Sequence, residues 1–321
     1  MKIFVYSCRS DEAGYFETFG EKYGVELTLC KDAPTLETAE LAKGFECISI
    51  ITSKIDAALL KKFYEVGVRY ISTRTIGFDH IDIKSADALG MQIGNITYSP
   101  GSVAEYTVML ILMALRKAKA ILQRSNVQDY SLRGVQGREL HNLTVGVIGT
   151  GRIGRTVIRN LSGFGCSLLA YDLYPDEETK RYAEYVPLEQ LFAQSDVITM
   201  HVPAAKDNFH LVNKDTIAKM KDGVILINTA RGSLIDTQDF IDGVESGKIG
   251  GAALDVVEDE FGLYYNDLKC KVLKNRGLAL LRSYPNVLVT PHTAFYTDQA
   301  VSDMVENSIK SCAAFMQEKI Q

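Results

Sequence analysis

TVGVIGTGRIGRTVIRNLSGFGCSLLAYD, residues 144–172, predicts a strand, a glycine loop, a helix, a second strand and a terminal acid in one continuous run. Residues 144–148 are apolar and β-branched, as in a buried parallel strand. Gly149, Gly151 and Gly154 follow at G-x-G-x-x-G spacing, and a helical pattern then extends to about residue 164. A second apolar strand over residues 167–171 ends at Asp172. The order of these elements favours a dinucleotide-binding βαβ unit.

Each conspicuous residue of this unit has a physical reason. Gly149 permits the tight turn, Gly151 lets the backbone approach a pyrophosphate, and Gly154 lets the helix pack closely on the strand. The helix N-terminus offers free N–H groups and a partial positive charge to phosphates. An ordinary βα turn would explain the glycines but not Asp172, whose carboxylate can accept both ribose hydroxyls. Because Asp172 would repel a 2′-phosphate and residues 173–178 contain no Lys or Arg, the predicted cofactor is NAD rather than NADP.

The composition limits the class of protein. A length of 321 residues predicts about two domains. A net charge of −5 without a basic run argues against nucleic acid as a partner. The six scattered cysteines contain no C-x-x-C, which argues against a metal site or a disulfide framework. With no signal-peptide core and no apolar run near the ~20 residues that span a bilayer, we expect a cytoplasmic protein without membrane attachment.

Strand and helix patterns alternate along the chain, which predicts an α/β fold with two doubly wound parallel sheets. Before the glycine loop, strands are expected at residues 2–6, 26–29, 47–51, 70–73 and 91–94, and helices at 35–43, 55–66 and 103–124. After it, strands are expected at residues 197–200, 224–228, 251–256 and 286–290. Residues 261–282 show no clean period, so they are expected to be irregular. A helical pattern after Tyr296 could return to pack on the first domain.

Polar side chains follow three of the later strands. Arg231 comes after residues 224–228, the acidic cluster Glu258-Asp259-Glu260 after 251–256, and His292 after 286–290. Ligands of an open α/β sheet bind outside the carboxyl ends of its strands. An Arg can grip a carboxylate, a His can transfer a proton near neutral pH, and a carboxylate can orient the His.

Each of these residues has a structural alternative when taken alone. Arg231 could be a surface ion-pair residue, His292 a structural histidine, and the acidic cluster a solvated turn. Their common position at strand ends after a nucleotide motif favours a function. His201, Val202 and Pro203 also follow a strand and are predicted to line the cofactor site, whereas the other histidines, His80, His141 and His210, are interpreted as structural.

The chain resembles the D-2-hydroxyacid dehydrogenase family over essentially its whole length. The resemblance lies in ISTRTIGFDHID (71–82), YSPGSVAEYTVMLILMALR (98–116), VGVIGTGRIG (145–154), HVP (201–203), INTARGSLID (227–236), GGAALDVVEDE (250–260) and VTPHTAFYT (289–297). The YSP and PHTAFYT segments are most similar to the D-lactate and D-2-hydroxyisocaproate dehydrogenase branch. Glu260 argues against the formate dehydrogenase branch, which pairs its His with a Gln.

The resemblance implies a set of site residues. It selects Glu260 within the acidic cluster and implies a catalytic trio of Arg231, Glu260 and His292. It implies that backbone N–H groups near Ile76 and Gly77 bind the substrate carboxylate and that Tyr98 and Phe295 line the substrate pocket. The implied cofactor contacts beyond the glycines, Asp172 and residues 201–203 are Arg152, Ile153, Thr229, Ala230 and Asp255.

The resemblance also implies an architecture. A flavodoxin-like substrate domain, residues 1–98 completed by 297–321, would receive a Rossmann NAD-binding domain of residues 99–296 as an insertion. A homodimer would form through the coenzyme domain, in which the helix expected at 103–124 has an apolar face.

The predicted activity is the NADH-dependent reduction of a 2-keto acid to the (R)-2-hydroxy acid, with pyruvate to D-lactate as the first candidate. The alternative is a larger substrate, as in (R)-2-hydroxyisocaproate or phenyllactate dehydrogenases. A rival from another class is a non-catalytic NAD-sensing protein, against which the intact Arg231, Glu260 and His292 argue.

Overall fold

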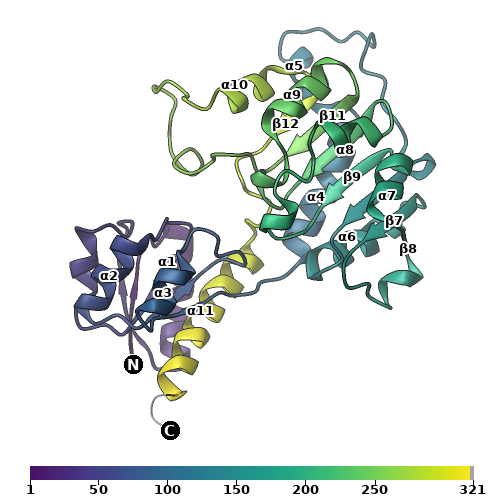
Figure 1. Ribbon diagram of the computed structural model, residues 1–321. Coiled ribbons are helices and arrows are strands. Elements are labelled where there is room, and N and C mark those ends of the chain that lie inside the picture. The colour runs from purple at the N-terminus through teal and green to yellow at the C-terminus, as the bar shows by residue number, and fades with distance from the viewer. Residues whose placement is uncertain (319–321) are drawn as a thin grey trace. The chain divides into compact units, whose positions relative to one another are not determined.

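The computed structural model describes residues 1–318, and the chain divides into two compact units. Unit 1 consists of Met1–Ser99 and the chain from Tyr296 onward, and unit 2 consists of Pro100–Phe295. Unit 2 is therefore an insertion in the sequence of unit 1 (Figure 1).

Unit 1 is built on a five-stranded parallel sheet with the order β2-β1-β3-β4-β5. Its strands are β1 (Lys2–Val5), β2 (Glu26–Leu29), β3 (Cys47–Ile50), β4 (Tyr70–Thr73) and β5 (Gln92–Gly94). This is the flavodoxin-like order, in which the chain reverses direction across the sheet after β2.

Helices cover both faces of this sheet, as the alternation of side chains along β1 shows. Ile3 and Val5 pack against α1 and α11, whereas Phe4 and Tyr6 pack in the cluster formed with α2. The helices of unit 1 are α1 (Ser10–Tyr23), the 3₁₀ turn η1 (Thr38–Ala42), α2 (Ala57–Val66), α3 (Ile83–Ala88) and α11 (Asp298–Glu318). Helix α11 contacts α1, β3 and β4 (Figure 1). The C-terminal helix thus completes the core of the unit that the N-terminal strands begin.

Unit 2 is built on a seven-stranded parallel sheet with the order β12-β11-β10-β9-β6-β7-β8. Its strands are β6 (Thr144–Ile148), β7 (Ser167–Tyr171), β8 (Glu184–Tyr185), β9 (Val197–Met200), β10 (Val224–Asn228), β11 (Ile249–Leu254) and β12 (Val287–Val289). The six strands from β8 to β11 have the Rossmann order, and β12 extends the sheet by one strand.

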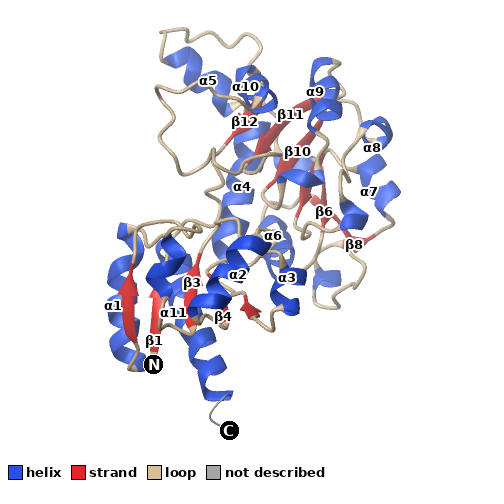
Figure 2. Cartoon of the chain, turned by 60° about the vertical axis from the view of Figure 1, so that its left-hand side comes forward, coloured by secondary structure: helices blue, strands red, loops and turns tan. Residues whose placement is uncertain are grey.

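Helices α4 and α6 cover one face of this sheet, and α7, α8 and α9 cover the other (Figure 2). The unit contains α4 (Gly101–Leu115), α5 (Ala118–Ser125), η2 (Leu140–Asn142), α6 (Arg152–Ser162), η3 (Thr179–Arg181), α7 (Leu188–Gln194), η4 (Lys206–Asn208), α8 (Lys214–Lys219), η5 (Gly232–Leu234), α9 (Thr237–Glu245) and α10 (Arg276–Ser283). No helix among residues 1–318 has the length and apolarity needed to cross a membrane.

Three local expectations were wrong, and one short strand was not predicted. The helix expected at 103–124 is broken into α4 and α5, because Lys117 adopts a left-handed backbone with φ of 52°. The helix expected at 35–43 is only the 3₁₀ turn η1. The segment expected to be irregular contains α10, whose N-terminus is capped by the Asn275 side chain. The two-residue strand β8 had no periodic signal, since a strand of that length shows no alternation.

Candidate active site

The glycine loop after β6 has the geometry of a phosphate-binding turn. Gly149 has a φ of 92°, and a Cβ on it would lie 2.7 Å from the carbonyl oxygen of His201. A Cβ on Gly154 would lie 1.9 Å from the carbonyl oxygen of Gly149. A Cβ on Gly151 would meet nothing within 4 Å, so open space lies in front of the α6 N-terminus. The loop is therefore closed where it packs and open where a pyrophosphate would approach the helix N–H groups.

Asp172, at the end of β7, is held beside this loop. One carboxylate oxygen accepts the backbone N–H of Thr150 at 2.6 Å, and the other accepts the N–H of Tyr174 at 2.9 Å. The hydroxyl of Tyr185 donates to Thr150 Oγ1 at 2.7 Å, so β8 supports the same corner. Arg155 of α6 also reaches this region, where Asp176 pairs with it at 2.8 Å. Local sequence reasoning missed Arg155 because it lies in a different element from Asp172.

Residues 201–203 follow β9, the neighbour of β6, and the first two of them contact the glycine loop, whereas Pro203 is exposed. The carbonyl oxygen of His201 and the Val202 side chain are the atoms that a Cβ on Gly149 would strike. The His201 ring lies 3.0 Å from Thr199 Oγ1, and burial lowers the pKa of His201 below its usual value. Its imidazole is therefore neutral at pH 7.

A buried asparagine shapes the turn that follows β10. The Asn228 side chain accepts the N–H of Ala230 at 3.0 Å and donates to the carbonyl of Arg231 at 2.8 Å. Thr229 is anchored to Thr107 of α4, with 2.9 Å between the two hydroxyl oxygens. These contacts define the turn after β10, and Arg231 lies at the N-cap of η5. The sequence patterns did not single out Asn228 because an amide at a strand end has many structural uses.

His292 and Glu260 are in direct contact in unit 2. His292 Nδ1 lies 2.5 Å from Glu260 Oε1, and their side chains are 24% and 20% exposed. The second oxygen of Glu260 accepts the backbone N–H of Val257 at 3.1 Å. A carboxylate at Nδ1 holds the proton on that nitrogen and leaves Nε2 to exchange a proton with a ligand.

The loop that carries His292 is held in a strained shape. His292 has a φ of 53°, an uncommon value for a residue with a Cβ. Its N–H donates to the carbonyl of Asp255 at 2.8 Å, and its carbonyl accepts from the Tyr265 hydroxyl at 2.7 Å. Strain of this kind persists only where the surroundings enforce it. Tyr265 belongs to the segment without a clean period, so no sequence signal pointed to it.

The buried carboxylate of Asp255 supplies most of that enforcement. It accepts the Thr290 hydroxyl at 2.5 Å, the Thr293 N–H at 2.9 Å and the Ala294 N–H at 2.8 Å. Three donors leave this carboxylate about one further acceptor site. In the structure Asp255 therefore positions the histidine loop, and the contact with the nicotinamide stays a prediction.

The turn that carries Arg231 lies against the turn that carries Glu260. A Cβ on Gly232 would lie 2.1 Å from the carbonyl carbon of Val257, so the two backbones touch there. Because Glu260 is bonded both to Val257 and to His292, the segments of all three predicted catalytic residues are linked by contacts within unit 2. The ring of Phe295 lies edge-on to the His292 ring, with centroids 6.4 Å apart.

In unit 1, the turn after β4 presents N–H groups. The carbonyls of Thr75, Ile76 and Gly77 accept from the N–H of Ile96 at 3.1 Å, the amide of Asn95 at 2.7 Å and the hydroxyl of Thr75 at 2.6 Å. The N–H groups of Ile76 and Gly77 have no acceptor among residues 1–318. A turn whose carbonyls are occupied and whose N–H groups have no acceptor among these residues is suited to an anion. Tyr98, the other predicted substrate contact of this unit, follows β5 and is partly exposed.

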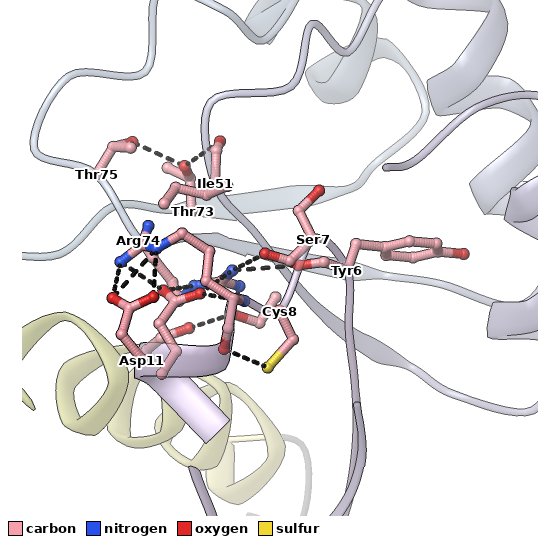
Figure 3. Close-up of polar contacts among 12 residues, drawn as sticks. Tyr6, Ser7, Cys8, Asp11, Ile51, Thr73, Arg74 and Thr75 are labelled. Carbon is pink, nitrogen blue, oxygen red and sulfur yellow. Dashed lines mark hydrogen bonds and ion pairs between the residues drawn. The ribbon is translucent and has the colours of Figure 1, made fainter. Parts of the chain in front are cut away.

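Directly before this turn lies a fully buried arginine that the sequence patterns did not single out. Arg74 donates to Glu12 Oε1 at 2.9 Å, to Ser49 Oγ at 3.1 Å and to the carbonyl of Tyr6 at 3.1 Å. Figure 3 shows its guanidinium among acceptors from several elements. The pair with Glu12 joins the end of β4 to α1.

Comparison with known proteins places this geometry in a family. The family model for the D-isomer specific 2-hydroxyacid dehydrogenase, NAD binding domain, matches residues 108–294. An aromatic 2-oxoacid reductase of Clostridium sporogenes is 45% identical over 318 residues, covering 98% of this chain and 96% of that protein. A D-lactate dehydrogenase of Lactiplantibacillus plantarum is 41% identical over 321 residues, covering 99% and 97% of the two chains.

A solved structure agrees with these sequence relatives. The crystal structure of a D-lactate dehydrogenase from Treponema pallidum superimposes with a TM-score of 0.89 and 34% identity, covering 99% of this chain and 97% of that one. The resemblance inferred from the motifs, the fold class and NAD as the cofactor are thereby confirmed. This chain belongs to the D-isomer specific 2-hydroxyacid dehydrogenase family and is an NAD-dependent enzyme that reduces 2-keto acids to D-2-hydroxy acids.

Proposed function

We propose that Arg231, Glu260 and His292 carry out the reduction in unit 2. Arg231 binds the substrate carboxylate through its planar guanidinium and polarises the neighbouring keto group. His292 donates a proton from Nε2 to the keto oxygen, while Glu260 stabilises the imidazolium form that makes this donation possible. When bound, NADH supplies the hydride. The observation that carries the proposal is the 2.5 Å contact between His292 and Glu260.

The remaining predicted contacts are proposed for the ligands around this chemistry. The N–H groups of Ile76 and Gly77 bind the carboxylate of the substrate, and Tyr98 and Phe295 line the space for its side chain. The pyrophosphate of NAD is held at Gly149, Gly151, Arg152, Ile153 and Gly154, and its ribose at Asp172. The nicotinamide end is contacted by His201, Val202, Pro203, Thr229, Ala230 and Asp255.

The proposed substrate is pyruvate, and the second candidate is an aromatic 2-keto acid such as phenylpyruvate. The name of the Clostridium relative supports the second candidate, and the name of the Lactiplantibacillus relative supports the first. Measuring kcat/KM for both acids with NADH decides between them, and a higher value for phenylpyruvate would replace pyruvate. Tight NADH binding without turnover on either acid, or on 2-ketoisocaproate, would instead support a non-catalytic NAD sensor.

We propose further that the enzyme is a cytoplasmic homodimer joined through unit 2. Met109 on α4 and Ile121 and Leu122 on α5 are exposed apolar side chains, which favours a covered surface there. All six cysteines are free thiols, as a reducing compartment requires. Light scattering on the purified protein tests the dimer, and a monomer at micromolar concentration contradicts it.

A further inference from the structure

A second histidine of unit 2 lies between two carboxylates. His210 Nε2 is 2.7 Å from Glu258 Oε1, and His210 Nδ1 is 3.1 Å from Asp236 Oδ2. All three side chains are between 25% and 29% exposed. The imidazole is therefore held by one carboxylate at each of its ring nitrogens.

The backbone holds this ring in place. His210 has a φ of 52°. Its N–H donates to the carbonyl of Ser233 at 2.9 Å, and its carbonyl accepts from the side-chain amide of Asn213 at 2.8 Å. The Phe209 ring stacks on the imidazole with centroids 3.8 Å apart. A strained backbone fastened at both ends indicates a ring whose position is specified rather than incidental.

The first carboxylate belongs to the segment that carries Arg231. Asp236 caps the N-terminus of α9 by accepting the N–H groups of Gln238 and Asp239 through Oδ1, both at 3.0 Å. Its other oxygen faces His210. Residues 231–236 therefore form a short bridge from the proposed substrate-binding arginine to the capped helix, and His210 pairs with the far end of that bridge.

The second carboxylate belongs to the segment that carries Glu260. Glu258 lies two residues earlier, and its Oε2 accepts both the N–H of Thr237 at 2.9 Å and the Thr237 hydroxyl at 2.5 Å. Its Oε1 faces His210. Glu258 thus joins the Glu260 turn to the start of α9, and His210 is a further partner of the same carboxylate.

We propose that His210, Asp236 and Glu258 form a positioning cluster. This cluster holds the Arg231 segment and the Glu260 turn in the relative position that the proposed reaction requires. The cluster itself contacts neither substrate nor cofactor in this proposal. It acts through Gly232 and Val257, whose backbones touch, and through the bond from Val257 to Glu260. The inference rests on the proposed roles of Arg231, Glu260 and His292.

Steady-state kinetics of three single variants test the cluster. His210→Gln removes the ring that joins the two carboxylates and loosens both segments, so we expect a loss in kcat/KM of about tenfold, shared between kcat and KM. Glu258→Gln acts through Glu260 and is expected to lower mainly kcat. Asp236→Asn acts through Arg231 and is expected to raise mainly the KM for the 2-keto acid.

The matched control is His141→Gln, because the His141 side chain is 58% exposed. Its ring nitrogen lies 3.8 Å from the Glu139 carboxylate, a longer distance than either contact of His210. This control is expected to keep wild-type kinetics. The NADH dissociation constant, measured by fluorescence, is expected to stay within about twofold of wild type in all four variants. Normal kinetic constants in His210→Gln, even with a lowered melting temperature, would overturn the positioning role and leave a purely structural one.

Failure of the proposed function is a different result, since wild-type turnover in His292→Ala would refute the catalytic trio whatever the state of His210.

Discussion

Two acid–base pairs, one in each unit, differ most in their burial. In unit 1 the side chains of Arg74 and Glu12 are both 0% exposed, and the guanidinium has further acceptors in Ser49 and the Tyr6 carbonyl. In unit 2 the side chains of His292 and Glu260 are 24% and 20% exposed. A buried and hydrogen-bonded pair of this kind serves the fold, because the loss of one partner leaves the other charge buried and unpaired. The pair of His292 and Glu260 is partly exposed, as the proposed proton transfer to a ligand requires.

The largest expected effect comes from the partly exposed pair, His292 and Glu260. His292→Ala removes the proposed proton donor and should lower kcat by about 10²–10⁴-fold. Because its ring is partly exposed, the free energy of unfolding should change little. Single-turnover NADH oxidation and urea denaturation measure the two quantities, and a variant with wild-type turnover would remove His292 from the mechanism.

Breaking the buried pair should have the opposite signature. Glu12→Gln leaves the Arg74 charge buried without its carboxylate, and we expect a loss of about 3–5 kcal/mol in the free energy of unfolding. Urea denaturation of this variant measures the loss. The double replacement Glu12→Gln with Arg74→Met removes both charges and should recover part of it. An unchanged denaturation midpoint in the single variant would show that water reaches the pair.

A smaller effect is expected where a charge is kept and only its geometry is lost. Arg231→Lys retains the cation but not the two parallel hydrogen bonds to a carboxylate, so KM for the 2-keto acid should rise about tenfold, or about 1.4 kcal/mol. The NADH dissociation constant serves as the control and should not move. An unchanged KM would assign the carboxylate grip to another group.

The smallest effect is expected at a surface ion pair that joins α1 to α11. Hydrogen bonds from Lys22 and Tyr23 lower the pKa of Glu306 from 4.5 to about 2. Because the folded-state pKa is depressed, this stabilisation is complete above pH 4.5 and is lost as the pH falls towards 2. The difference in melting temperature between wild type and Glu306→Gln should therefore shrink from pH 6 to pH 3. A difference that grows on acidification would contradict the assignment.

The contrast between the pairs also shows which parts of the site were accessible from sequence. His292 and Arg231 stand directly after apolar strands, so their place at the sheet edge could be predicted from the strand pattern. The carboxylate partner of His292 was harder to predict, because Glu258, Asp259 and Glu260 are adjacent and spacing cannot distinguish them. The family resemblance selected Glu260, and the structure pairs Glu260 with His292 and Glu258 with His210. Whether Glu260 and His292 act as proposed stays a prediction.

The residues that support the site could not be predicted from the sequence in the same way. Tyr265 lies in a segment without periodicity, and Arg74 is a charged residue at a strand end whose partner is 62 positions away. Lys117, which breaks the helix expected at 103–124, sits in a left-handed conformation that no local pattern required. Such features depend on which segments fold against each other.

By itself the sequence determined the two doubly wound sheets, the glycine loop and the preference for NAD. These follow from local sterics and periodicity, because a turn, a strand and an adjacent acid interact within a few tens of residues. Only the tertiary structure decided which carboxylate pairs with which histidine, across 32 positions for His292 and 48 for His210. The reason is that hydrogen-bond partners are chosen by distances of about 3 Å, and such distances exist only once separate strand ends have been brought to one edge of a sheet.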